Sequence, residues 1–171
     1  MALNLKNLFG KLNDTTRAAM EGAAAQCVSR GHRHIEIEHY LASLTQVRNT
    51  DLARICARFQ IDTARLELEL QRSLNHLEIA HTGSPALSHT LVTLLGQAWC
   101  VGSINYGAQK IRSGFTLLAL IDADHHHELP AELRKLNPAA VEDQFEEAVR
   151  KSVEKEAAAG SPPPAAPQLA D

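Results

Sequence analysis

Apolar residues recur along most of the chain at the spacing of three to four that places side chains on one face of a helix. Leu66, Leu70 and Leu74 are one example, and two Ala- or Leu-rich segments, Thr15 to Ser29 and Leu87 to Val101, extend the pattern. No convincing run alternates apolar and polar residues with the period of two that is typical of strands. The pattern therefore predicts an all-α fold.

The order of predicted elements occurs twice along the chain, as a long helical segment, a glycine, a short extended bridge and a second helix that begins at Glu38 or Gly114. Self-similarity at a fixed offset indicates a structural repeat. We therefore predict a pseudo-twofold tandem repeat of two four-helix motifs. Gly31, Ile35, Leu41 and Leu44 recur 76 residues later as Gly107, Ile111, Leu117 and Leu120, and Leu66, Leu70 and Leu74 match Val141, Phe145 and Val149 after a slip of one residue.

Several helix starts are predicted from residues that satisfy free backbone N–H groups. Ser113 fits the N-cap of the helix in the second half, whereas Ile37 at the equivalent position lacks a polar side chain. Glu36 or Glu38 is therefore expected to place negative charge at the positive end of that helix. Two further starts are predicted, at Asp62 before a helix over 63–73 and at Asn137-Pro138 before a helix that continues to about Glu156.

Composition narrows the possible functions. The chain has 171 residues, of which 44% are hydrophobic, enough for one compact domain or two small subdomains that share a core. Its 17 basic and 20 acidic residues give a net charge of -3, so nucleic acid is not expected as a partner. The N-terminal apolar run is too short and interrupted for a signal peptide. Residues 79–109 lack charge but contain too many polar side chains for a membrane span.

The three cysteines also indicate a cytosolic protein. Cys27, Cys56 and Cys100 are an odd number with no C-x-x-C pair, and each lies within an apolar helical pattern. We expect them to be reduced thiols in the core.

Two histidine-containing segments raise the possibility of a metal site. Residues 34–39 read HIEIEH, but His34 and His39 are five residues apart and would point roughly 140° away from each other on a helix. Residues 124–128 read DHHHE, and consecutive residues do not readily close a tetrahedral shell around one ion. No metal site is therefore predicted. A small metal-dependent hydrolase that uses His34, Glu38, His39 or the DHHHE segment remains a third alternative.

The second helix of the first half begins with Glu38, His39 and Leu41. This glutamate-histidine-leucine run, in a tandem four-helix repeat, resembles the N-terminal domain of the Clp family of AAA+ unfoldases. Within the family the chain looks most like ClpV, the group that serves type VI secretion. That resemblance is carried by GKLN at 10–13, IEIEH at 35–39, DLARI at 51–55, SPALS at 84–88 and IRSG at 111–114.

The resemblance implies a binding function. ClpV-like proteins form ATP-driven hexamers, and their N-domain captures a helix near the N-terminus of the large sheath subunit, TssC or VipB, so that contracted sheath is disassembled. The phosphate-binding pattern G-x-x-x-x-G-K-[ST] is absent, because Gly10-Lys11 lacks the earlier glycine. We therefore expect no catalytic residue and no cofactor in this chain, with ATP and magnesium bound elsewhere in a parent protein. The runner-up is the adaptor-binding or substrate-binding N-domain of a general Clp chaperone.

An apolar groove that accepts a captured helix requires apolar residues beyond those that the repeat core needs. Four such residues precede the first repeat and have no counterpart before the second. We predict that they form one wall and that the start of the second repeat forms the other, although buried Leu and Phe residues more commonly seal a core. The predicted walls are Leu5, Leu8, Phe9 and Leu12 on one side and Pro85, Leu87 and Leu91 on the other.

These observations divide the chain into segments. Residues 1–12 are expected to form an additional N-terminal helix. Residues 13–156 form the Clp N-domain, with repeats at about 13–80 and 81–156. The Ala- and Pro-rich residues 157–171 read as a flexible linker toward an absent AAA+ module. We expect this fragment to be a cytoplasmic monomer without membrane contact and its parent protein to be a hexamer.

Overall fold

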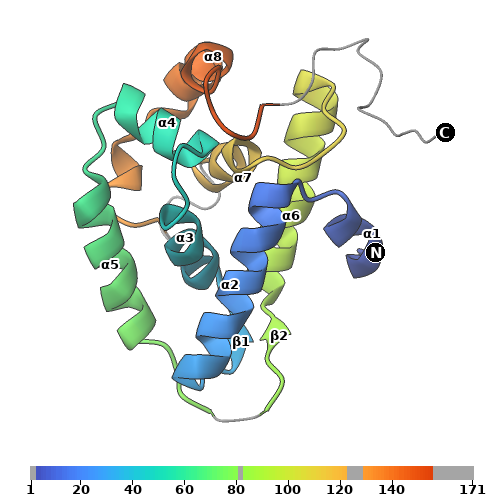
Figure 1. Cartoon of the computed structure of the whole chain (residues 1–171), viewed down its shortest axis with the longest axis vertical. Coiled ribbons are helices and arrows are strands. Elements are labelled where there is room, and N and C mark those ends of the chain that lie inside the picture. The colour runs from blue at the N-terminus through green and yellow to red at the C-terminus, as the bar shows by residue number, and fades with distance from the viewer. Residues whose placement is uncertain (1–2, 81–82, 123–128, 156–171) are drawn as a thin grey trace, which may run out of the picture.

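The computed structural model describes residues 3–80, 83–122 and 129–155 and is almost entirely helical (Figure 1). This confirms the predicted fold class. A short α1 (Leu5–Gly10) precedes a first repeat of α2 (Asp14–Arg30), α3 (Ile37–Thr45), α4 (Asp51–Arg58) and α5 (Thr63–Asn75). The second repeat consists of α6 (His89–Cys100) and its π-helical extension η1 (Val101–Asn105), α7 (Ser113–Leu120), the 3-10 turn η3 (Leu133–Lys135) and α8 (Pro138–Ala148).

The second repeat differs from the first in two places. Where α4 forms the third helix of repeat one, residues 129–137 of repeat two contain the three-residue η3 in the described part of the chain. The helix α6 also continues beyond its predicted end into η1, where Gly102 lies against Phe115. A Cβ atom at Gly102 would lie 2.4 Å from a ring carbon of Phe115, so only glycine permits this approach.

Short parallel strands join the two repeats reciprocally. Strand β1 (His34–Ile35), which precedes α3, pairs with β2 (Ala86–Leu87), which precedes α6. The equivalent bridge joins Leu12, before α2, to Ile111, before α7. In each repeat, the segment just before the first helix thus pairs with the extended segment before the second helix of the other repeat. The sequence did not predict these strands because two residues are too few to show alternation.

One hydrogen bond lies on the pseudo-twofold axis of the repeat. The hydroxyl groups of Tyr40 and Thr116, two residues that are 76 apart and therefore equivalent, are 2.8 Å from each other. Equivalent residues of two repeats meet only close to the axis that relates them. Thr116 donates its own proton to the carbonyl oxygen of Ser113, so Tyr40 is the donor in this pair. Burial raises the pKa of Tyr40, which keeps the phenol protonated for this role.

A buried polar cluster forms the second contact between repeats. Arg112 donates from Nε and Nη2 to the two carboxylate oxygens of Asp51, each at 2.8 Å. The carboxylate of Glu154 accepts from the backbone N–H groups of Ser113 and Asp51, both at 2.7 Å, and from the Asn13 side chain at 3.1 Å. These residues join the starts of α2, α4 and α7 to the segment that follows α8.

This cluster corrects two predictions from the sequence. Ser113 is the first residue of α7 and not its N-cap, because Glu154 and Asp51 supply the acceptors for the free N–H groups of Ser113 and Gly114. The last helix ends at Ala148 rather than near Glu156, since the chain must turn to bring Glu154 into the cluster. Residue 156 itself lies outside the described residues.

Other local predictions agree with the structure. Asp62 caps α5 by accepting from the Arg65 N–H at 3.1 Å, and Asn137 caps α8 by accepting from the Ala140 N–H at 3.2 Å. The apolar residues that matched between the two last helices are all buried. Cys27 and Cys56 are buried as predicted, but Cys100 is exposed, because it borders a hollow in the surface.

Removing the positive charge of Arg112 should cost more stability than removing an exposed one. Arg112→Met leaves the fully buried carboxylate of Asp51 without its charged partner, and we expect the free energy of unfolding to fall by about 3–5 kcal/mol. The matched control Arg150→Met removes an exposed pair with Glu147, and its expected cost is below about 1 kcal/mol. Urea unfolding measures both, and equal losses would contradict the structural role of the buried pair.

Candidate helix-binding groove

An apolar groove of about 550 Å³ lies between α1, α2 and the paired strands. The helix α2 contributes Arg17, Met20, Glu21 and Ala24, which follow the i, i+3, i+4, i+7 spacing of one helix face. Apolar side chains form most of the floor and walls, while Arg17 and Glu21 are exposed. The other lining residues are Phe9, Gly10, Ile35, Pro85 and Leu87.

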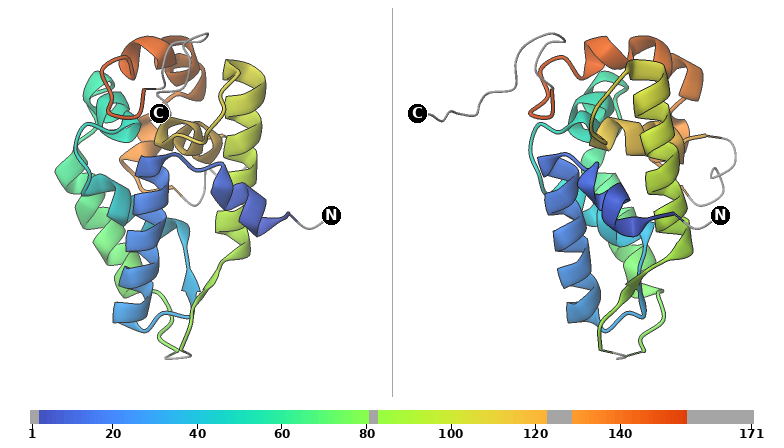
Figure 2. Two further views of the ribbon diagram at one scale, coloured as in Figure 1. Left: turned by 45° about the vertical axis from the view of Figure 1, so that its right-hand side comes forward. Right: turned by 90° about the vertical axis from the view of Figure 1, so that its right-hand side faces the viewer.

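The helix α1 is fixed on one side of this groove by several independent contacts. Asn4 caps it by accepting from the Asn7 N–H at 3.0 Å, and Lys110 donates to the Gly10 carbonyl oxygen at 2.9 Å. Leu8 is buried in the core. Leu3 approaches α6 so closely that a Cβ atom at Gly96 would lie 2.9 Å from its side chain. Figure 2 shows α1 beside α6.

The structure brings together three of the seven residues that the sequence predicted for the groove walls. Phe9, Pro85 and Leu87 line it and are all half-buried. Leu8, Leu12 and Leu91 instead belong to the hydrophobic core, where each is no more than 7% exposed. Leu5 is 43% exposed and does not line the groove.

Sequence reasoning missed the part of the groove that α2 supplies. The Ala-rich segment of α2 packs closely on α3 at Gly22, where an added Cβ would lie 2.3 Å from the Ser43 hydroxyl. Met20 and Ala24 lie on a different face of α2 from Gly22, and they border the groove. Their spacing of four residues was a usable signal, but the sequence does not show which face another element covers.

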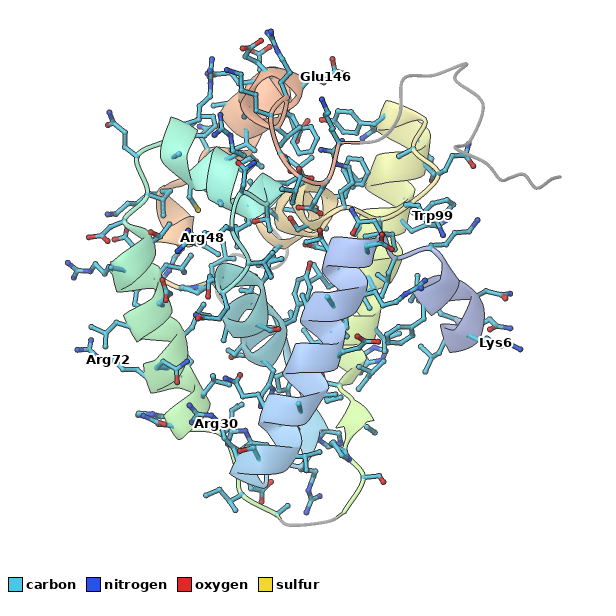
Figure 3. The ribbon with its side chains drawn as sticks, in the orientation of Figure 1. Lys6, Arg30, Arg48, Arg72, Trp99 and Glu146 are labelled. Atoms are coloured by element: carbon cyan, nitrogen blue, oxygen red, sulfur yellow. The ribbon has the colours of Figure 1, made fainter. Side chains whose placement is uncertain are left out.

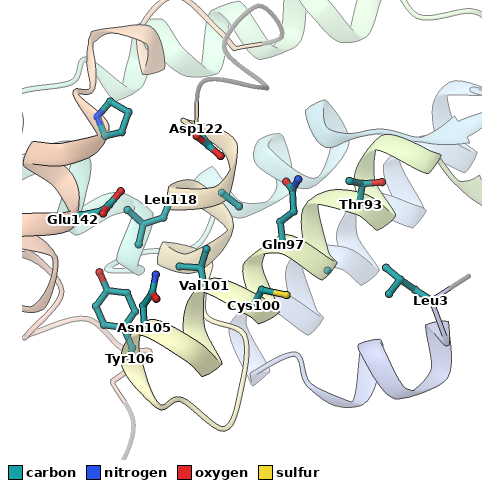
Figure 4. Close-up of a pocket in the computed structure, with 13 residues that line it drawn as sticks. Leu3, Thr93, Gln97, Cys100, Val101, Asn105, Tyr106, Leu118, Asp122 and Glu142 are labelled. Atoms are coloured by element: carbon teal, nitrogen blue, oxygen red, sulfur yellow. The ribbon is translucent and has the colours of Figure 1, made fainter. Parts of the chain in front are cut away.

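A second hollow, of about 570 Å³, lies between α6 with η1 and the helices α7 and α8 (Figure 4). Figure 4 shows Gln97 of α6, Val101 of η1 and Tyr106, which follows η1, together with Leu118 of α7. Glu142 and Asp122 add carboxylates to its border. None of the seven predicted wall residues lines this hollow.

The HIEIEH segment serves the start of α3. The backbone N–H of Glu36 donates to Nδ1 of His39 at 2.9 Å, and the Glu36 side chain accepts from the N–H of His39, which completes a capping box. Nε2 of His39 therefore carries the ring proton and donates to Nδ1 of His32 at 2.8 Å. Within residues 3–80, 83–122 and 129–155, no three His, Cys, Asp or Glu side chains are placed to hold a metal ion. The DHHHE segment lies outside the described residues.

The two histidines are held in their neutral forms. Burial lowers the pKa of His39 to about 4, with smaller contributions from His32 and Arg30. Burial, followed by the charge of Arg30, also lowers the pKa of His32. Both rings are at most 6% exposed, so a positive charge on either would lie in the protein interior.

Comparison with known proteins identifies the family. The protein-family model of the Clp repeat N-terminal domain matches residues 11–134 of the sequence. The chain belongs to this Clp N-domain family. Among its relatives, the AAA+ ATPase ClpV1 of Pseudomonas aeruginosa is 31% identical over 151 residues, which are 86% of this chain and 17% of ClpV1. The chaperone ClpB of Yersinia enterocolitica is 33% identical over 121 residues, which are 71% of this chain and 14% of ClpB.

A solved Clp N-domain of the ClpV type supports the assignment in three dimensions. The ClpV N-domain in complex with a VipB peptide superimposes with a TM-score of 0.77 at 26% identity, covering 91% of this chain and 97% of that one. The resemblance to the ClpV N-domain drawn from the sequence is therefore confirmed. Among the residues that the structure describes, no helix of this Clp N-domain has the length and apolarity to cross a membrane.

Acid should destabilise the domain through the histidine pair. Because the folded-state pKa of His39 is below the usual value, the unfolded chain takes up protons first, and stability is lost as pH falls from about 6.5 to 4. Glu154 acts in the opposite direction, since burial and the Asp51 carboxylate raise its pKa. Urea unfolding of the parent and of His39→Gln isolates the histidine contribution, which we expect to be on the order of 2 kcal/mol over this range. Parallel pH profiles for the two proteins would contradict it.

Proposed function

We propose that this Clp N-domain recognises substrate for a type VI secretion AAA+ unfoldase by binding a helix near the N-terminus of the large sheath subunit, TssC or VipB. The observation that carries the proposal is the apolar groove between α1 and the strands, in a domain similar to a ClpV N-domain solved with a VipB peptide. Capture of this helix promotes disassembly of contracted sheath by the parent protein.

The groove suits the apolar face of one helix. A captured helix presents side chains at i, i+3, i+4 and i+7, and a volume of about 550 Å³ holds a few of them. Phe9 lies on the α1 side, with Pro85 and Leu87 on the strand side. Burial of such side chains supplies most of the affinity, while Arg17 and Glu21 are positioned to select the charges that flank the apolar face.

The chemistry of the parent protein lies outside this domain. A Clp N-domain is a substrate-binding domain and is not catalytic. We propose that residues 1–12 are an added element that completes the groove, that residues 13–156 form the two repeats, divided near residue 80, and that residues 157–171 link the domain to an AAA+ module. In this proposal the fragment is a cytoplasmic monomer, and its parent is a hexamer that uses ATP and magnesium.

One alternative binding function is supported by a specific observation. The similarity to ClpB covers 71% of this chain at 33% identity, so the same fold also occurs in a general chaperone. In that case the groove receives an adaptor or a misfolded chain. The hydrolase alternative has less support, because His39 is occupied in the capping box and the pair with His32.

Calorimetric titration with a synthetic peptide from the N-terminal region of the cognate large sheath subunit tests the proposal. We expect saturable binding, and a loss of at least about tenfold in affinity for Phe9→Asp and for Leu87→Asp, because each places a charge in the apolar contact. Leu8→Asp is unsuitable, since Leu8 is 7% exposed and its substitution threatens the fold.

Leu68→Asp is the matched control, because Leu68 is a leucine on α5 that is 50% exposed and lies outside the groove. It should bind as the parent domain does. A scrambled peptide should not bind. If the native peptide fails to bind a folded domain that does bind an unfolded model chain, the general chaperone function replaces the sheath function.

A further inference from the structure

A polar cleft of about 640 Å³ separates α4 from the end of α8, on a part of the surface distinct from the helix-binding groove. Four cations line it, Arg54 and Arg58 from α4 and Arg150 and Lys151 from the turn after α8, against the single carboxylate of Glu147. This local excess of positive charge contrasts with the net charge of -3 for the whole chain. We refer to it as the basic cleft.

Hydrogen bonds and one ion pair hold the walls of the basic cleft in place. Arg58 donates from Nε to Gln144 on α8 at 2.8 Å, which fixes its guanidinium across the cleft. The backbone carbonyl oxygen of Lys151 accepts from the Asn49 side chain at 2.9 Å, so the turn that carries Lys151 is tied to the start of α4. Arg150 pairs with Glu147. These bonds preorganise the cleft, and only Arg150 is neutralised by the carboxylate that lines it.

Arg54 provides the observation that points to a ligand. Its Nε is buried and has no hydrogen-bond partner among the residues that the structure describes. Arg54 as a whole is half-buried, but an N–H donor that is buried without an acceptor still costs free energy, because it has lost its hydrogen bond to water and gained none in return. The i, i+4 spacing of Arg54 and Arg58 places both guanidinium groups on the same face of α4. An acceptor in the cleft would therefore meet two arginines one turn apart.

A purely structural explanation accounts for part of this charge. Cations stabilise the negative C-terminal end of a helix, and Arg58 is in the last turn of α4 while Arg150 lies two residues beyond the end of α8. Arg54 lies in the middle of α4, where this effect is small. The acidic residues Glu142 and Glu146 of α8 do not line the cleft. Burial, followed by the charges of these two residues, raises the pKa of Tyr106, which lines the second hollow.

We propose that the basic cleft binds an acidic polypeptide segment of a partner protein, whose carboxylates pair with Arg54, Arg58 and Lys151. Arginine and carboxylate groups form the strongest hydrogen-bonded ion pairs available to side chains. The cleft extends between two helices and is larger than a single small anion requires. It contains no aromatic side chain for base stacking, and the chain as a whole is acidic, which disfavours nucleic acid. This site acts independently of the proposed sheath groove.

Fluorescence anisotropy with a labelled glutamate-rich peptide of about ten residues, at about 50 mM salt, tests the proposal. We expect the parent domain to bind it and the double variant Arg54→Gln, Lys151→Gln to lose at least about tenfold in affinity. Lys6→Gln with Arg72→Gln is the matched control, because it changes the net charge equally. Figure 3 shows Lys6 on α1 and Arg72 on α5, both far from the end of the molecule where α8 carries Glu146.

Several outcomes would overturn the proposal. These are no binding by the parent domain, an equal loss in the cleft and control variants, equal affinity for a glutamine peptide, or tighter binding of a single-stranded oligonucleotide at the same residues. Competition by the sheath peptide would also overturn the claim of a separate site. Retention of the parent melting temperature by both double variants, together with retained sheath-peptide binding, would show that any loss arises from the cleft itself.

Discussion

The two repeats are held together by charges that have been removed from water. Asp51 and Glu154 place two carboxylates at the N-terminal ends of α4 and α7, where free backbone N–H groups need acceptors, and Arg112 pairs with Asp51. Neither carboxylate is more than 5% exposed. Such an arrangement is stable only if every acceptor is satisfied at once, which requires the start of α2, the start of α4, the start of α7 and the end of the chain to occupy fixed positions.

The position of the helix-binding groove follows from this arrangement. The same Asn13 that caps α2 also reaches Glu154, and its backbone N–H bonds to Ile111 of the other repeat at 3.0 Å. Immediately before it, Leu12 and Leu8 anchor α1 in the core. The groove wall that bears Phe9 is therefore attached to the most constrained part of the domain. The opposite wall, Pro85 and Leu87, is held by the parallel pairing of β2 with β1. A rigid groove loses little entropy when it orders around a ligand.

The domain presents two surfaces of different chemistry. The groove beside α1 is apolar and suits a helix whose binding depends on the burial of side chains. The basic cleft is at the junction of α4 and α8, beside the Asn49 contact that secures the last described turn. An apolar contact sets affinity with little dependence on salt, whereas a charged contact steers a partner over a longer range and weakens as ionic strength rises. Two such sites on one small domain can recognise two features of a single partner.

The sequence by itself determined the helices, the repeat and the family. Helix periodicity depends on local spacing, caps such as Asp62 and Asn137 act within three residues, and the offset between repeats is visible in the letters alone. It also showed that HIEIEH belongs to a helix start.

Only the tertiary structure decided which of those residues reach the groove and which chemistry surrounds them. Leu8 and Phe9 are adjacent and similarly apolar, yet one is in the core and the other lines the groove, because the direction of a side chain depends on where α1 packs. Ser113 was predicted to cap α7, but the acceptor for its backbone N–H is the carboxylate of Glu154, which is 41 residues away. The basic cleft joins residues nearly one hundred positions apart. Such contacts depend on the closure of the whole chain, which local patterns do not encode.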